Sequence, residues 1–342
     1  MYIPLSIPSR YQRPALLAAT LLLALIWGGT FGVTKYILLQ RLSVGALLSV
    51  RFVLGTAFIG AAILLMRKPF DRRSVIDGAI LGLILVTIFW LQVDGQRFTT
   101  TSKSGFITGL VVIFTPMASL LLGDRFKLSH GVGALLACLG LFFFVRDPGA
   151  PFGGWNRGDT ETLACAVLCG FHVALTARFS RRGSAWVIAL MQISVVAAVS
   201  CALTSVLPTL ESDGQAMAGF GMLGPALRRP DIWFGLLYLA VLATTLGFYM
   251  QATVQSKLNA TEAAIIFTTE PVFAAILAVS GVIPGIKETL SMTQIAGGAL
   301  IVAAMLLAEL GPKFFRPARV RQSGVPAPPG EVDPESRPSR DA

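Results

Sequence analysis

The chain consists of long apolar stretches separated by short polar turns that often contain glycine or proline. Since a helix needs about 20 mostly apolar residues to cross a bilayer, this pattern predicts ten membrane-spanning helices. The expected fold class is an all-α polytopic membrane protein. The ten segments lie at 14–36, 44–66, 75–93, 103–122, 129–146, 160–179, 185–207, 231–252, 262–283 and 291–310.

Composition supports this interpretation and narrows the function classes. Of the 342 residues, 54% are hydrophobic and only 13% are charged, against about 25% charged in soluble domains. The chain contains no HExxH, GxSxG or P-loop motif, so we expect neither an enzyme nor an ATP-driven pump. All four cysteines lie in apolar runs without a CxxC pattern, and there are only two histidines, His130 and His172. We therefore expect no metal site and no cofactor.

The net charge of +10 is explained by topology and not by nucleic-acid binding. Lysine and arginine are concentrated in alternate loops, on the side that also holds both termini. Under the positive-inside rule, both termini are cytoplasmic and the chain is a multi-pass protein of the cytoplasmic membrane. Residues 1–13 form a cytoplasmic N-terminal segment. Residues 311–342, rich in proline and charge, form a cytoplasmic tail that we expect to be disordered.

The two halves of the chain resemble each other. GDRFKLSHGVGALLACLG (123–140) aligns without gaps on KETLSMTQIAGGALIVAA (287–304), and FTPMASLLL (114–122) on TEPVFAAIL (269–277). These matches predict five-helix repeats at 14–146 and 160–310, joined by a linker at 147–159. Because five is odd, the second repeat enters the membrane from the opposite side, which is typical of secondary transporters.

A family resemblance is carried by five stretches in a fixed order. They are LIWGGTFGVTK (25–35), SVRFVLG (49–55), TTTSKSGFITGLVVIFTPMASLLLGDR (99–125), LNATEAAIIFTTEPVFAAILA (258–278) and QIAGGALIVAAMLLAEL (294–310). Over about residues 14–310 the chain resembles the EamA-type ten-span transporters of the drug/metabolite transporter superfamily. It departs from their pattern at Gly170, where tryptophan is frequent, and in the longer turn at 280–289. The resemblance implies a carrier of small metabolites, often outward, without fixing the solute.

Glu270, followed directly by Pro271, is the main candidate for a site residue. Ionisable groups at membrane depth are functional hypotheses by default, and a proline in a helix removes a hydrogen bond and bends the axis. The first repeat has Thr115 and Pro116 at the matching position, so the kink is duplicated but the acid is not. We expect Glu270 to contact the solute or couple its transport. The alternative is a carboxylate that hydrogen-bonds a neighbouring span.

Five further polar or aromatic residues are candidates with open alternatives. Arg51 is expected to pair with a carboxylate such as Glu270 or Asp94, to contact the solute or to reach the surface. His172 would relay protons or hydrogen-bond a neighbouring helix. Gln92 and Gln251 would line a cavity or lie near the membrane interface, and Trp27 would pack against an apolar solute or face lipid or the core.

Together these features predict a secondary transporter that moves an amphiphilic small metabolite, such as an amino-acid-like solute, by alternating access. The sequence leaves open whether protons or a counter-solute drive it. Three GxxxG motifs, starting at Gly28, Gly78 and Gly105, serve helix packing within a monomer or in a homodimer. The alternatives are a lipid or lipid-linked flippase of the same fold and a non-transporting membrane scaffold. The expected partners are the solute and the lipid bilayer, with no nucleic acid.

Overall fold

A computed structural model describes residues 9–123, 128–145, 154–206, 219–221, 223–257, 267 and 269–314. These residues are helical or form turns between helices, with no strand among them. Residues 1–8, most of the predicted linker and residues 315–342 lie outside the described parts. The predictions for the terminal segments therefore stay predictions.

The described residues of the first half form six helices, of which two share one apolar segment. They are α1 (Ser9–Leu39), α2 (Val44–Leu65), α3 (Arg72–Phe98), α4 (Thr101–Gly109), α5 (Val111–Leu121) and α6 (Leu128–Val145).

The second half contains the remaining described elements, including a stretch of π-helix, η2. They are α7 (Arg157–Ser180), α8 (Ala185–Val206), α9 (Leu223–Leu227), α10 (Pro230–Leu237), η2 (Tyr238–Leu246), α11 (Gly247–Lys257), α13 (Glu270–Ser280) and α14 (Met292–Phe314).

The expectation of a polytopic membrane protein is confirmed by helix length and composition. Seven described helical segments are long and apolar enough to cross a membrane, and three shorter apolar helices cover 131–144, 270–280 and 292–307. These three overlap the predicted segments 129–146, 262–283 and 291–310. The seven long segments are Ala18–Leu39, Val44–Leu65, Arg72–Phe98, Thr101–Leu121, Arg157–Ser180, Ala185–Val206 and Pro230–Thr253.

Polar residues cap several of these helices and so fix where each begins. Ser43, Asp71 and Thr100 each accept a hydrogen bond from a backbone N–H in the first turn of the helix that follows. Asn156 and Asp159 form a reciprocal capping box at the start of α7, three residues before the predicted boundary at 160. The hydrogen bonds from Ser74 also hold the pKa of Asp71 below its usual value.

The two prolines of the predicted kinks have different surroundings. Pro116 lies inside α5, and the helical segment is already broken at Leu110, between α4 and α5. Pro271 lies in the first turn of α13, which starts at Glu270. A proline there costs little, because the N–H groups of a first turn have no partner within the helix. The predicted mid-helix kink at Pro271 is therefore a helix start in the described chain, and residues 258–266 lie outside the described parts.

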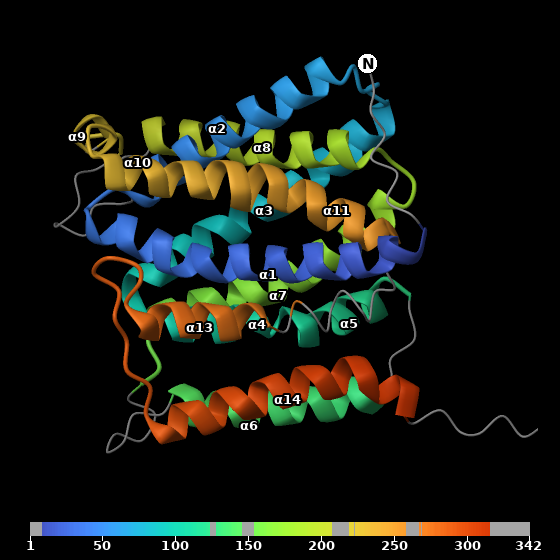
Figure 1. Cartoon of the computed structure of the whole chain (residues 1–342), viewed down its shortest axis with the longest axis vertical. Helices are drawn as coiled ribbons and strands as arrows, with labels where there is room; N and C mark the ends of the chain where they lie inside the picture. Colours follow the sequence, from blue (N-terminus) through green and yellow to red (C-terminus); the bar gives the residue numbers. More distant parts are fainter. Residues whose placement is uncertain are drawn as a thin grey trace, which may run out of the picture.

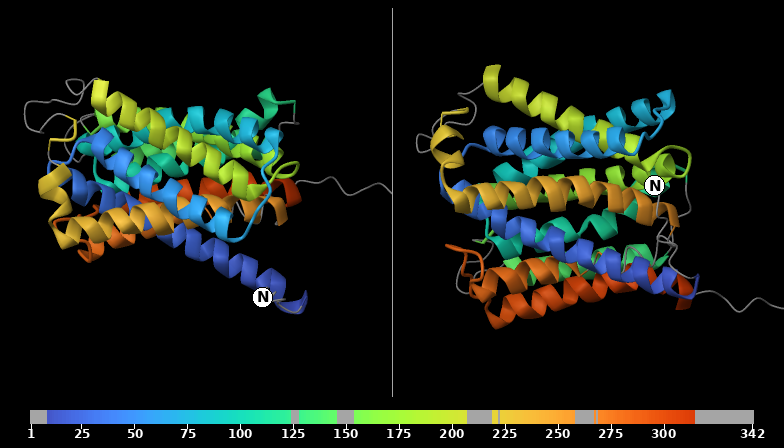
Figure 2. Two further views of the ribbon diagram at one scale, coloured as in Figure 1. Left: turned by 90° about the horizontal axis from the view of Figure 1, so that it is seen from above. Right: turned by 45° about the horizontal axis from the view of Figure 1, so that its top comes forward.

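The helices pack in successive layers (Figure 1). α6 and α14 form a pair at one end, and α2 and α8 lie at the opposite end. Between them lie α13 with α4 and α5, then α1 and α7, then α3 and the α10–η2–α11 segment, an order that the tilted view in Figure 2 also shows. The central layers hold α1, α3, α7 and α11, which carry Trp27, Gln92, His172 and Gln251.

Glycines bring the central helices into close contact. A Cβ at Gly28 would lie 2.8 Å from the carbonyl oxygen of Glu270, and one at Gly82 would lie 2.9 Å from that of Gln192. Gly105 packs in the same way against α13. All three predicted GxxxG motifs thus make packing contacts within one chain. The departure at Gly170 has a reason too, because a Cβ there would lie 2.8 Å from the backbone of Phe114.

Candidate functional site

A row of aromatic side chains crosses the centre of the bundle from Phe267, which precedes α13, to α2. Trp27 on α1 stacks on Phe267 with ring centroids 5.7 Å apart and contacts Phe248 of α11 at 6.1 Å. Phe248 in turn contacts Phe89 of α3 at 6.2 Å, and Phe89 contacts Phe52 of α2 at 4.7 Å. We call these five residues the aromatic row. Trp27, expected to pack against an apolar solute or to face lipid or the core, links Phe267 to Phe248 in this row.

Arg51 lies at the α2 end of the aromatic row. Its guanidinium stands 4.6 Å from the centroid of the Phe89 ring and 5.3 Å from that of Phe52, and the residue is only 3% exposed. Its Nε donates a hydrogen bond of 2.8 Å to Thr244 Oγ1. The predicted ion pair with Asp94 is wrong, because Asp94 binds other arginines, and no carboxylate of the described residues pairs with Arg51.

The π-helix η2 supplies polar contacts to two neighbouring helices. Trp27 Nε1 donates to the carbonyl of Ala243 at 3.0 Å, and Thr245 Oγ1 is 3.0 Å from the carbonyls of Gly55 and Ala240. At the start of η2, the Tyr238 hydroxyl donates to the carbonyl of Ile26 on α1 at 2.5 Å. π-Helical segments occur frequently at functional sites. Here the segment aims threonine side chains and a backbone carbonyl at α1 and α2.

Glu270 lies three residues after Phe267 and so at the other end of the aromatic row. It is half-buried and is in the first turn of α13, where the helix dipole favours a negative charge. Its carboxylate forms no hydrogen bond or ion pair with any residue of the described chain. It is near enough to the Cys165 thiol of α7 for an electrostatic interaction. The carboxylate is thus held between helices without a fixed partner there.

The remaining predicted site residues have different environments. His172 on α7 is buried, and its Nε2 is 2.9 Å from Gln192 Oε1 on α8, which is the predicted hydrogen bond between helices. The His172 ring also packs edge-on against Phe248 at 6.3 Å. Gln251 on α11 is buried, and its Oε1 has no partner among the described residues. Gln92 on α3 is half-buried, and Thr115 Oγ1 donates to the Val111 carbonyl within α5 at 2.7 Å.

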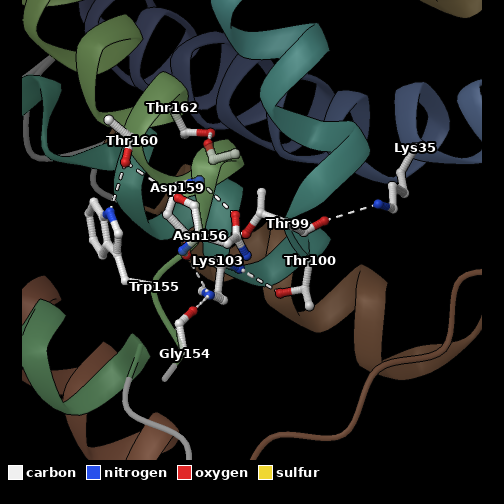
Figure 3. A network of polar contacts seen from close by, with 11 residues as sticks. Lys35, Thr99, Thr100, Lys103, Gly154, Trp155, Asn156, Asp159, Thr160 and Thr162 are labelled. Carbon is white, nitrogen blue, oxygen red and sulfur yellow. Dashed lines mark hydrogen bonds and ion pairs between the residues drawn. The ribbon is translucent and has the colours of Figure 1, made fainter. Parts of the chain in front are cut away.

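A second polar region lies where α3 ends and α4 and α7 begin (Figure 3). Lys103 Nζ pairs with Asp159 Oδ2 at 2.6 Å and also donates to the Gly154 carbonyl. The other oxygen of Asp159 accepts from the Thr99 hydroxyl. The side chain of Lys103 is 9% exposed and that of Asp159 is fully buried. We call this region, together with the contacts described next, the polar end. Lys103 is here part of a buried ion pair.

Two further charged residues connect the polar end to other helices. Lys35 of α1 donates to the backbone carbonyls of Gln96, Arg97 and Thr99 at 2.6, 3.3 and 3.0 Å. Glu288 follows the turn after α13 and accepts hydrogen bonds from the N–H groups of Thr101 and Ser102 at 2.5 and 3.0 Å. The unusually long turn at 280–289 therefore places a carboxylate at the N-terminus of α4.

Several residues that make contacts in η2, at the polar end or along the aromatic row are not among those predicted from the sequence. The Thr244–Thr245 pair inside an apolar run was the available signal for η2, but periodicity does not distinguish a π-helix from an α-helix. Asn156-x-x-Asp159 is readable as a capping box, yet the pairing of Asp159 with Lys103 depends on the packing of α4 on α7. Gln192 is an amide inside an apolar run, the same signal that marked Gln92, whereas Phe248 carries no signal that sets it apart from the many other phenylalanines.

Comparisons with known proteins identify the family of this chain. A sequence model described as the EamA-like transporter family matches residues 14–146 and 158–310. A curated relative, an uncharacterized transporter of Archaeoglobus fulgidus, is 29% identical over 290 residues, covering 84% of each chain. A crystal structure described only as that of a protein superposes with a TM-score of 0.60 at 18% identity, covering 91% of this chain and 99% of the other, which shows the fold alone. The chain belongs to the EamA-like transporter family.

Proposed function

We propose that this EamA-type transporter is a secondary carrier of a small amphiphilic metabolite, with its solute site in the centre of the bundle. The site lies along the aromatic row, between Arg51 and Glu270. Two inverted five-helix repeats rock about this site and expose it alternately to each side of the cytoplasmic membrane. Both termini lie in the cytoplasm, the direction is outward, and protons or a counter-solute drive the movement.

The pattern of helix contacts supports the repeat architecture. α6 packs on α14 and α2 packs on α8, and each pair joins the corresponding helices of the two halves. α1 packs on α13 as α7 packs on α4 and α5. α3 packs on α7 and α8, and η2 packs on α1 and α2 in the same relation. Such matched contacts are expected of two repeats related by a twofold axis in the membrane plane.

The observation that carries the proposal is the environment of the Glu270 carboxylate. A structural carboxylate inside a membrane protein is normally paired, since an unpaired one is expensive. Glu270 has no ion pair or hydrogen bond to the described residues and lies beside the backbone contact between Gly28 and α13. The carboxylate is therefore available to a proton or to a cationic group of the solute. Relative movement of α1 and α13 would change its surroundings.

Uptake of the solute into proteoliposomes with imposed pH gradients tests the coupling role of Glu270. We expect Glu270→Gln, which keeps the shape but cannot exchange a proton, to lose the dependence of transport on the gradient. Glu161→Gln is the matched control, because Glu161 pairs with Arg157 at the polar end, away from the aromatic row.

Normal, gradient-dependent transport by a folded Glu270→Gln variant would refute the coupling role. Transport of phospholipid analogues alone would favour a flippase. Movement of neither solute nor lipid would favour a membrane scaffold.

A further inference from the structure

Arg51 differs from the other arginines whose pairing the structure describes. Arg182 binds Asp77 through two hydrogen bonds of 3.2 Å, and Arg157 pairs with Asp94 at 2.7 Å. Both of these guanidinium groups are partly exposed, with side chains 42% and 63% accessible. Arg51 is 3% exposed and pairs with no carboxylate among the residues that the structure describes. The most buried of these cations is thus the one that lacks a counter-charge.

Most hydrogen-bond donors of Arg51 are unused. A guanidinium carries five N–H donors, and the bond to Thr244 uses the one on Nε. The four donors on Nη1 and Nη2 make no hydrogen bond to any residue that the structure describes. The flanking rings of Phe52 and Phe89 attract the cation through their faces, but they offer no acceptor in the guanidinium plane. A buried guanidinium with four unused donors requires a hydrogen-bond acceptor beyond those that the described residues supply.

We infer that Arg51 binds an oxyanion of the transported solute, and that this solute carries a carboxylate on an apolar body. The inference rests on the proposed function in placing the solute along the aromatic row. The planar pair of terminal NH₂ groups matches a carboxylate in bidentate geometry. The apolar body lies against Phe89, Phe248 and Trp27, which continue the row away from Arg51.

The charge of the site favours a monoanion. Arg51 is the only cation that the described residues place on the aromatic row, since Lys35 and Lys103 are bound at the polar end. A phosphate dianion would keep one uncompensated negative charge in an apolar interior, which is costly. A carboxylate is neutralised by one guanidinium. At the other end of the row, Glu270 is free to take a proton or a cationic part of the same molecule.

Thermal unfolding of the purified protein with a matched ligand series tests the inference. The probes are phenylacetate, indole-3-acetate and octanoate, each beside the alcohol of the same skeleton, with phenylphosphonate as the alternative oxyanion. We expect the carboxylates to raise the Tm of the wild type in a concentration-dependent way, and the alcohols to leave it unchanged. Arg51→Gln should weaken carboxylate binding by about tenfold or more, because a charge-assisted hydrogen bond is lost. Arg51→Lys should retain part of the binding without bidentate geometry.

The outcomes separate this inference from the proposed function. Equal effects of acids and alcohols on the wild type, or no effect of any carboxylate, would overturn the inference, and this comparison needs no variant to fold. Undiminished binding by Arg51→Gln would overturn it as well, and a preference for phenylphosphonate would replace the carboxylate by a phosphate-type group. Carboxylates that bind through Arg51 but do not exchange across proteoliposomes would leave the anion site standing and contradict the transport proposal. Exchange of carboxylates that is unchanged by Arg51→Gln would support the transport proposal and contradict the anion site at Arg51.

Discussion

The polar end and the aromatic row use charged residues in opposite ways. At the polar end, Lys103 and Asp159 form a buried ion pair, and Glu288 is held by two backbone N–H groups. On the aromatic row, Arg51 is buried with one hydrogen bond and the Glu270 carboxylate has none to the described chain. Both regions lie inside the helix bundle, so burial alone does not separate a structural charge from a functional one.

The two regions differ in whether their buried charges have a full set of hydrogen-bond and ion-pair partners. A buried charge with a complete set of partners fixes the distance between the helices that carry it, here α4 and α7. A buried charge without them raises the energy of the empty protein and lowers it when a complementary group arrives. The polar end therefore fixes helix positions, whereas the aromatic row holds the charges that the proposed solute would complete. Three predictions test this contrast, in order of decreasing effect on stability.

The largest effect is expected from Lys103→Met. The substitution leaves Asp159 buried and without its counter-ion, and breaking a buried pair in this way costs about 3–5 kcal/mol. The free energy of unfolding, or the Tm in detergent, should fall accordingly. Combining Lys103→Met with Asp159→Asn should recover much of the loss, since both charges are then removed. A single variant as stable as the wild type would show that the polar end does not hold the helices together.

Much of the fold was predictable from the sequence because bilayer thickness imposes a simple rule on apolar length. All ten predicted segments overlap apolar helices of the structure. Pro116 predicted a bend in the fourth segment, but the break between its two helices lies at Leu110. The position of Pro271 in a first turn was signalled by Thr269 and Glu270 directly before it, since threonine before a helix and proline at its first positions mark a helix start. The apolar runs on both sides nevertheless favoured one continuous helix with the proline inside the span.

The candidate site was predictable only as a set of residue types. Arg51 and Glu270 are visible as charges inside apolar runs, and Trp27 as an aromatic residue near the middle of a span. Their partners depend on which helices meet. Arg51 was assigned a carboxylate, but the π-helix η2 brings Thr244 to it instead, and the aromatic row is assembled from residues on five segments that lie far apart in the sequence.

An intermediate effect is expected from Glu288→Gln. The neutral amide has one acceptor oxygen for the two N–H groups of Thr101 and Ser102, and it loses the favourable charge at the N-terminus of α4. We expect a loss of about 1–2 kcal/mol in unfolding free energy, again measured by thermal or denaturant unfolding. Glu288→Asp keeps the charge on a shorter side chain and is the control. A loss as large in the control would indicate that reach, and not charge, holds α4.

The smallest effect on stability is expected from Arg51→Met, and its sign distinguishes the two regions. Methionine fills a similar volume against Phe52 and Phe89 and removes a buried charge that lacks a carboxylate. The lost hydrogen bond to Thr244 and the lost cation–π contacts act in the other direction. We therefore expect the unfolding free energy of the ligand-free protein to change by less than about 1 kcal/mol, while the response to phenylacetate disappears. If Arg51→Met instead destabilised the protein as strongly as Lys103→Met, Arg51 would be a structural residue, and the contrast between the aromatic row and the polar end would fail.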